Sequence, residues 1–178
     1  YDIRGNVDGQ ITAEACELIG RAFGTELRER YQLDHPRVVV GRDARTHGPE
    51  LEDATVRGLV AAGCQVLRIG QTPSPINYFT ICTQQLDGGV QLTASHNPAH
   101  DNGLKLQIRD AEAYSGDELQ KLRVRIDEKN FLDGEGSEED LDAITPYLDH
   151  LQAMFGAVGS NLKVVIDTGN GVAGPVYV

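Results

Sequence analysis

The stretch RVVVGRDARTHGPELEDATVRGLVAAGCQVLRIG, residues 37–70, decides the fold class. It begins with a short β-branched run, 37–41, of the kind found in buried strands. A helix is predicted from Gly48-Pro49, because proline is favoured in a first helical turn and the apolar residues after it recur at helical spacing. After Gly63 the run 65–69 predicts another strand. Strands that alternate with helices indicate an α/β fold with a largely parallel sheet.

The same alternation continues on both sides of this stretch. The opening residues are expected to be irregular up to Thr12, which can cap a helix. A capping box, Ser115-Gly-Asp-Glu118, predicts the start of a later helix, and Lys105 is expected on the face opposite its neighbouring leucines. Further helices are expected at 13–27 and 76–86, and further strands at 89–93 and 104–108. We therefore expect a three-layer α/β/α sandwich with a mixed, largely parallel sheet.

The C-terminal part predicts a second unit. The sequence Gly-Glu-Gly-Ser-Glu-Glu-Asp, 134–140, is small and acidic and predicts an exposed loop or linker. A helix at 145–155 and a strand at 162–167 are expected next, before a glycine-rich turn at 169–174. Because a buried strand and a first helical turn cannot cover themselves, we expect the start of a second, similar domain that is truncated. The expected domains are 1–141 and 142–178.

Composition excludes several classes of partner. The chain has 178 residues, 40 % of them hydrophobic, and a formal net charge of −11, which repels nucleic acid and anionic membrane surfaces. No apolar run approaches the roughly 20 residues that span a bilayer. The three cysteines show no metal-ligand spacing and predict reduced core thiols. We expect a cytoplasmic protein that binds neither nucleic acid nor membrane.

The segment Ser95-His96-Asn97-Pro98 interrupts the strand pattern with residues that could carry chemistry. Taken alone, it is typical of an ordinary polar turn. The flanking Asp-Asn-Gly of 101–103 predicts a second tight turn, which would return Lys105 to the same pocket as the serine. A hydroxyl, an amide and an ammonium in one pocket indicate an anion site that contains a nucleophile.

Other interpretations stay open at this point. A Ser-His-acid hydrolase is disfavoured, because the sequence lacks a Gly-x-Ser-x-Gly elbow. Arg4, expected on a loop, is either a surface arginine or a fork for a phosphate oxygen. The Arg-Asp-x-Arg of 42–45 is typical of an ion-pair cluster that braces loops. The turn 169–171 is either a tight strand-to-helix corner, which we favour, or a phosphate cradle.

Five motifs in order and spacing resemble the α-D-phosphohexomutase family, over essentially the whole chain. The chain looks most like the bacterial phosphomannomutase/phosphoglucomutase group, because it opens with Tyr-Asp-Ile-Arg-Gly and not with the Gly-Thr-Asp-Gly-Ile-Arg-Gly of phosphoglucosamine mutases. The motifs are Tyr-Asp-Ile-Arg-Gly (1–5), Gly-Arg-Asp-x-Arg (41–45), Thr-Ala-Ser-His-Asn-Pro (93–98), Asp-Asn-Gly-Leu-Lys (101–105) and Asp-Thr-Gly-Asn-Gly-Val-Ala-Gly (167–174).

The resemblance implies a phosphoserine enzyme that interconverts hexose 1-phosphate and 6-phosphate, of mannose or glucose, through a hexose 1,6-bisphosphate. Ser95 would carry the phosphoryl group, which would also ligate Mg²⁺. Lys105 and Arg4 would give acid/base or electrostatic assistance, and His96 is a further candidate catalytic residue. His96 and Asn97 would hold the loop and its phosphate, and Tyr1 would line the sugar pocket.

The resemblance also implies partners that this chain lacks. The family's later domains supply the carboxylate loop for the metal, the sugar-recognition loop and a further phosphate-binding loop. We therefore expect the 178 residues alone not to turn over substrate. A phosphoglucosamine mutase and a non-catalytic sugar-phosphate-binding module remain the alternatives.

Overall fold

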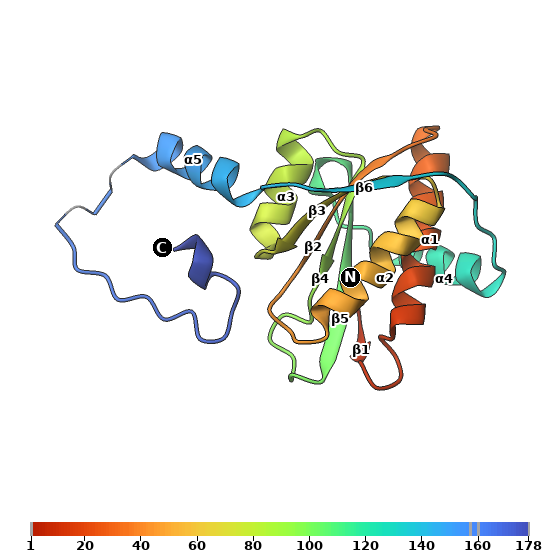
Figure 1. The fold of residues 1–178 in the computed structure, drawn as a ribbon, viewed down its shortest axis with the longest axis horizontal. Coiled ribbons are helices and arrows are strands. Elements are labelled where there is room, and N and C mark those ends of the chain that lie inside the picture. Colours follow the sequence, from red (N-terminus) through yellow and green to blue (C-terminus); the bar gives the residue numbers. More distant parts are fainter. Residues whose placement is uncertain (1, 157, 160, 178) are drawn as a thin grey trace.

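The computed structural model describes residues 2–156, 158–159 and 161–177, and most of them form one layered α/β unit (Figure 1). Its six-stranded sheet has the order β1-β5-β4-β2-β3-β6. The pairs β4/β2, β2/β3 and β3/β6 are parallel, and β1/β5 and β5/β4 are antiparallel. The strands are β1 (Ile3–Asn6), β2 (Arg37–Arg42), β3 (Gln65–Gln71), β4 (Gly88–Leu92), β5 (Asp101–Ile108) and β6 (Ser137–Asp140). The mixed sheet confirms the predicted fold class.

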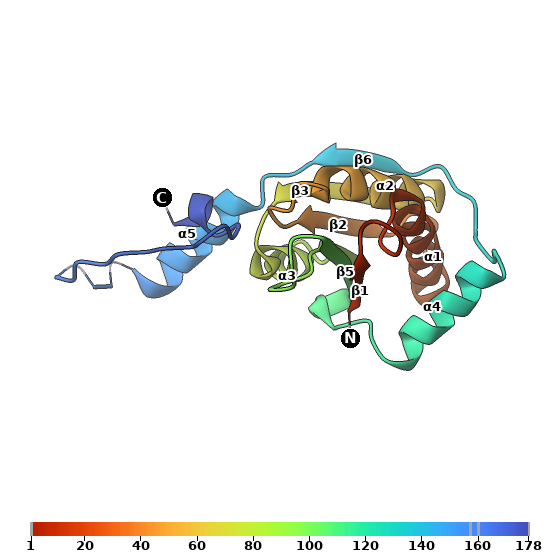
Figure 2. The same ribbon diagram turned by 90° about the horizontal axis from the view of Figure 1, so that it is seen from below.

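Helices cover both faces of the sheet, as Figure 2 shows. Successive residues of β2 point to opposite faces, so Val38 and Val40 join the core beneath α1 and α2, whereas Val39 joins the core beneath α3. Both faces are therefore apolar, which explains the continuous β-branched run of this strand. The helices are α1 (Ala13–Tyr31), α2 (Gly48–Ala61), α3 (Ser74–Thr83), α4 (Asp117–Asp127) and α5 (Ile144–Phe155).

The first two helices start and pack as the sequence predicts. The Thr12 side chain accepts a hydrogen bond of 3.1 Å from the amide of Ala15 and caps α1. Proline stands in the first turn of α2. The two helices approach closely at Gly20 and Gly58, where an added β-carbon would lie 2.4 Å from the Thr55 carbonyl oxygen and 2.0 Å from the Glu17 carbonyl oxygen.

Two expectations near the N-terminal edge of the sheet are wrong. The opening is not irregular, because Ile3–Asn6 forms β1, and Arg4 therefore lies on a strand and not on a loop. The segment 101–103 is not a tight turn but the start of β5, in which Gly103 pairs with Arg4. An added β-carbon at Gly103 would lie 2.2 Å from the Ile3 carbonyl oxygen, so the glycine serves the close pairing of these strands.

Two further expectations are corrected in the connecting segments. Ser137–Asp140, within the predicted acidic loop, forms the edge strand β6 along β3. The capping box is absent: α4 begins after Gly116 without a side-chain cap. The Glu118 carboxylate instead forms an ion pair with Arg30 of α1, so tertiary charge pairing replaces the local cap.

The chain after β6 leaves the sandwich, and Figure 1 shows α5 and the following segment extending away from the sheet. The predicted helix is confirmed as α5, but residues 162–167 form no strand. A strand needs a hydrogen-bonded neighbour, and this segment pairs with no described residue; Val165 is 95 % exposed. The division into domains at 141/142 stays a prediction.

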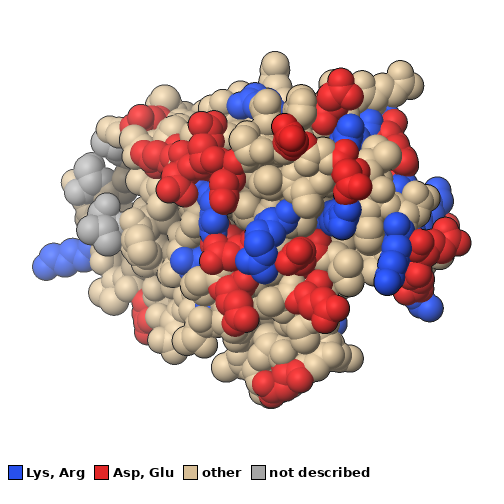
Figure 3. Space-filling model, turned by 45° about the vertical axis from the view of Figure 1, so that its right-hand side comes forward, with Lys and Arg blue, Asp and Glu red and all other residues tan. Residues whose placement is uncertain are grey.

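Charged side chains of both signs are interspersed on the face drawn in Figure 3. Several ion pairs in the described part of the chain join different elements, such as that of Arg68 of β3 with Glu138 of β6. In the described part of the chain, no helix has the length and apolar character that crossing a membrane requires.

Candidate functional site

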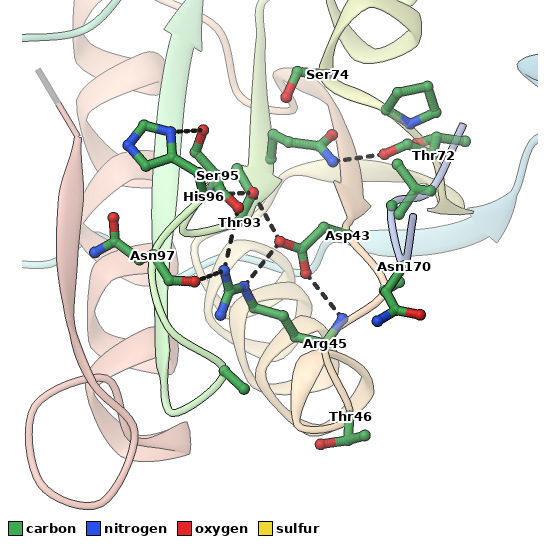
Figure 4. Close-up of a pocket in the computed structure, with 16 residues that line it drawn as sticks. Asp43, Arg45, Thr46, Thr72, Ser74, Thr93, Ser95, His96, Asn97 and Asn170 are labelled. Carbon is green, nitrogen blue, oxygen red and sulfur yellow. Dashed lines mark hydrogen bonds and ion pairs between the residues drawn. The ribbon is translucent and has the colours of Figure 1, made fainter. Parts of the chain in front are cut away.

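The loop that carries Ser95 leaves the carboxyl end of β4, on the same edge of the sheet as the loops after β2 and β3. Figure 4 shows the cavity of about 640 Å³ between these loops. Ser95, His96 and Asn97 line it. Ser95 is exposed and has a φ of 55°, in the left-handed region that non-glycine residues rarely adopt. The loop therefore holds this serine in a conformation that requires support from its surroundings.

That support comes first from Arg45, which lies on the loop after β2. Its Nη1 donates to the carbonyl oxygens of Pro98 (2.6 Å) and Asp101 (2.8 Å). Its Nη2 donates to the carbonyl oxygens of Ser95 (3.2 Å) and Asn97 (2.8 Å). One guanidinium thus binds four backbone carbonyls of the serine loop, and Figure 4 shows it beneath that loop.

A second connection runs through Asp43. Its carboxylate accepts from Arg45 Nε (3.1 Å) and from the Thr93 hydroxyl (2.8 Å). The Thr93 oxygen in turn accepts from the Ser95 amide (2.9 Å). All five N–H groups of Arg45 are therefore used. The predicted ion-pair cluster at 42–45 is confirmed, and its function in the structure is to fix the serine backbone.

His96 lies beside the serine that precedes it. The distance between Ser95 Oγ and His96 Nδ1 is 3.4 Å, at the long end for a hydrogen bond. No described carboxylate forms a hydrogen bond or ion pair with the His96 ring. The pair therefore lacks the third group that orients the histidine in a hydrolase triad.

Arg4 contacts the serine loop at Ala94 and Asn97, and Lys105 is joined to Arg4 through one shared carboxylate, that of Asp2. Lys105 Nζ donates to the two Asp2 oxygens at 3.0 and 2.9 Å. Arg4 Nε donates to Asp2 Oδ2 at 3.1 Å, and its Nη1 reaches Asn97 Oδ1 at 3.2 Å. Lys105 follows Leu104 in β5 and lies on the face opposite to it, as predicted.

The Asp2 carboxylate is stabilised in its charged form. Burial alone would raise its pKa, but the hydrogen bonds and positive charges of Lys105 and Arg4 outweigh burial and lower the pKa below the usual value. The side chains of Asp2 and Lys105 are only 8 % and 10 % exposed, so this pair is shielded from solvent. Asp2 is therefore an anion at neutral pH.

The wall of the cavity includes residues that the sequence did not single out. Thr72 and Gln91 are buried in it, and Gln91 Nε2 donates to the Thr72 carbonyl oxygen at 2.8 Å. Ser74, the first residue of α3, lies beside them. Asn170 and Gly171 border the same cavity and belong to the glycine-rich turn that the sequence did single out, but the favoured strand-to-helix corner is wrong, because 162–167 form no strand before it. The turn thus lies at the serine loop, although Asn170 follows Asn97 by 73 residues in sequence.

The described residues do not fit Mg²⁺ by themselves. No group of three or more His, Cys, Asp or Glu side chains in 2–156, 158–159 and 161–177 could hold a metal ion. The Asp43 carboxylate lies in the cavity wall, but Arg45 and Thr93 occupy it. Hard cations such as Mg²⁺ need oxygen ligands, and Ser95 Oγ is one such atom.

The candidate site residues thus form two adjacent groups. Ser95, His96 and Asn97 line the cavity, and Lys105 and Arg4 meet at Asp2 beside it. Tyr1 lies outside the described residues. Sequence reasoning missed Asp2, although it stands inside the opening motif; a carboxylate two residues before an expected phosphate-binding arginine was the available signal.

Comparison with known proteins gives consistent results. The family model "Phosphoglucomutase/phosphomannomutase, alpha/beta/alpha domain I" matches residues 1–133. Over 176 residues the chain is 41 % identical to the phosphomannomutase/phosphoglucomutase of Pseudomonas aeruginosa and 34 % identical to the phosphoglucomutase of Neisseria gonorrhoeae. The matches cover 99 % and 98 % of this chain but 37 % of each relative. The chain therefore spans little more than a third of the length of these relatives.

The solved structures agree. A phosphoglucomutase/phosphomannomutase family protein from Burkholderia thailandensis superposes with a TM-score of 0.92 at 38 % identity, over 99 % of this chain and 39 % of that one. A phosphoglucomutase from Paramecium, 17 % identical, superposes with a TM-score of 0.76 and shows the same fold.

Proposed function

Because the chain belongs to the phosphoglucomutase/phosphomannomutase family, we propose that it is the part of a hexose-phosphate mutase that carries the phosphoryl group, on Ser95. The observation that supports this most is the Arg45 guanidinium beneath the serine loop. It binds four carbonyl oxygens of that loop and thereby holds an exposed hydroxyl in a strained backbone conformation beside a cavity. A loop that served only as a connection would not need this support.

The proposed reaction consists of two phosphoryl transfers. In the first, the bond between Ser95 Oγ and phosphorus breaks, and phosphorus bonds to a free hydroxyl oxygen of a hexose phosphate. The proton of that sugar hydroxyl ends on Ser95 Oγ. The resulting 1,6-bisphosphate reorients and returns its other phosphoryl group to Ser95, so that the 1-phosphate and the 6-phosphate interconvert.

The residues around Ser95 have electrostatic functions in this proposal. A phosphoryl transition state needs positioning and neutralisation of charge more than covalent assistance. Arg4 carries a positive charge next to the loop and Lys105 carries a second one close to Arg4, and the single negative charge of Asp2 offsets one of the two. The trio therefore has a net charge of +1. Asn97 and His96 would orient the phosphoryl group, and Tyr1 would contact the sugar.

The cofactor and the cellular location belong to the same proposal. Mg²⁺ would bind the phosphoryl oxygens on Ser95 and withdraw charge from them, and we expect its carboxylate ligands in the part of the relatives' length that this chain does not span. Hexose 1,6-bisphosphate would charge the serine. We place the protein in the cytoplasm, where hexose phosphates occur and thiols such as Cys16, Cys64 and Cys82 stay reduced.

The decisive test uses a protein that carries this chain together with the remaining length of its relatives. After incubation with glucose or mannose 1,6-bisphosphate, intact mass and peptide mapping should locate one phosphate on Ser95, and added hexose phosphate should remove it. The variant Ser95→Ala should lose turnover. The variant Ser137→Ala, at an exposed strand residue, should keep the turnover of the wild type. A Ser95→Ala enzyme with undiminished activity would refute the proposal. A Ser95 that the bisphosphate does not phosphorylate, in a protein that still binds hexose phosphate, would favour a non-catalytic binding module.

Glucosamine phosphate as the preferred substrate would indicate a phosphoglucosamine mutase. The same assay, run with mannose, glucose and glucosamine phosphates, makes this distinction.

A further inference from the structure

The contact between Lys105 and Arg4 through Asp2 carries an inference about a residue so far given no function. The Asp2 carboxylate is the point at which β1 and β5 bring their two cations together. Lys105 Nζ contacts both of its oxygens, and Arg4 Nε contacts one of them. The arrangement is closely packed, because the Asp2 side chain is only 8 % exposed.

Two positively charged side chains that lie close together, as Lys105 and Arg4 do, repel one another, and a carboxylate between them offsets this repulsion. Removal of one partner of a buried ion pair leaves an uncompensated charge, which the structure avoids by moving that side chain toward water. For Lys105 and Arg4, loss of the Asp2 charge would thus favour conformations in which the cations separate. The positions of both cations therefore depend in part on this carboxylate.

The same contacts extend to the serine loop. Arg4 Nη1 lies 3.2 Å from Asn97 Oδ1 and 3.4 Å from the Ala94 carbonyl oxygen, on either side of Ser95 in sequence. Asn97 Nδ2 donates to Asp101 Oδ2 at 3.0 Å. A shift of the Arg4 side chain would therefore break its hydrogen bonds to the loop that carries Ser95.

We propose that Asp2 is a positioning residue: its negative charge holds the Lys105 ammonium against the Arg4 guanidinium, which contacts the Ser95 loop, and phosphoryl transfer depends on that placement. The inference rests on the proposed function for its kinetic consequence. Asp2 itself touches neither substrate nor phosphorus and acts through the two cations.

The test compares three variants of a protein that carries this chain with the remaining length of its relatives. Asp2→Asn keeps the shape and removes the charge, Asp2→Glu keeps the charge, and Asp8→Asn makes the same chemical change at an exposed position on the adjacent segment. We expect Asp2→Asn to lower kcat by about tenfold to a hundredfold, since small displacements of catalytic groups have effects of this size. The rate at which a hexose bisphosphate phosphorylates Ser95 should fall by the same factor. The KM of this variant should change less than its kcat.

The control variants separate charge from general damage to the fold. Asp2→Glu should recover part of the lost rate, and Asp8→Asn should match the wild type. Equal losses in Asp2→Asn and Asp2→Glu, or a wild-type kcat in Asp2→Asn, would overturn the inference.

A crystal structure of Asp2→Asn supplies a readout that does not depend on activity. Lys105 and Arg4 should leave the positions that they share in the wild type, and unchanged positions would refute the positioning function even in a protein with no mutase activity. Absence of mutase activity in the wild-type protein, by contrast, would count against the proposed function.

Discussion

Arg45 Nη2 lies 3.2 Å from the carbonyl oxygen of Ser95, so the guanidinium binds the backbone of the residue that it supports and leaves the serine hydroxyl free. The Arg45 side chain is only 12 % exposed. Its hydrogen bonds are therefore sheltered from water, and no other cationic side chain could reproduce their planar, forked geometry.

Arg45→Lys should loosen the serine loop. Lysine keeps the charge but cannot reach four carbonyl oxygens at once, and the loss of charge-assisted hydrogen bonds should lower the free energy of unfolding by about 1–3 kcal/mol. Urea denaturation measures this value, and hydrogen exchange of residues 93–101 should become faster. The control is Arg57→Lys, a half-exposed ion-pair residue, for which the change should stay within about 0.5 kcal/mol. Equal losses of unfolding free energy at both positions would contradict the supporting function of Arg45.

Glycine at position 95 should be more stable than alanine. At a φ of 55° a β-carbon is strained and glycine is not, so Ser95→Gly should exceed Ser95→Ala in free energy of unfolding by about 0.5–1 kcal/mol. The opposite order is expected at Ser137, which lies in the extended strand β6. Denaturant unfolding of the four variants checks the prediction, and alanine ranking above glycine at 95 would show that the residue is not strained.

Gly58→Ala should force α1 and α2 apart. The new methyl group would lie 2.0 Å from the Glu17 carbonyl oxygen, which is backbone and cannot turn aside. Overpacking of this kind should lower the free energy of unfolding by about 1–3 kcal/mol. Gly9→Ala is the matched control, because its β-carbon meets no described atom within 4 Å. A wild-type midpoint for Gly58→Ala would mean that the helices separate at little cost.

The three thiols should differ in reactivity. Burial raises the pKa of Cys16 to about 11 and that of Cys64 to about 12, so both remain protonated and inaccessible at pH 8. Cys82 is exposed. A chromogenic disulfide reagent should therefore label one thiol rapidly in the folded protein and three in denaturant. Cys82→Ser should abolish the rapid phase; a rapid phase that survives this change would contradict the burial of the other two.

The parts of the fold that depend on local pattern could be predicted from the sequence. The run 38–40 is valine at every position because helices cover both faces of the sheet, and this continuity is visible without a structure. Ser95 stood out because a polar turn interrupted the strand pattern, and Arg45 because its motif is typical of loop ion pairs.

The remaining elements depend on contacts distant in sequence. Asp101-Asn102-Gly103 has the composition of a turn, yet pairing with β1 draws it into a strand. The segment 137–140 is too acidic to predict a strand. It forms an edge strand nevertheless, because its side chains stay exposed to water and its backbone pairs with β3. Asp2 gains Lys105 as a partner only when β1 is placed against β5, a contact that no local spacing reveals.

The strand β6 also determines where the chain leaves the sandwich. Its backbone is bonded to β3, and the Leu141 amide donates to the Arg68 carbonyl oxygen at 2.8 Å. Ala143, two residues later, is buried against the core beneath α3. The chain therefore leaves the sheet from a fixed point and not as a slack tether, so the start of α5 is held against the sandwich.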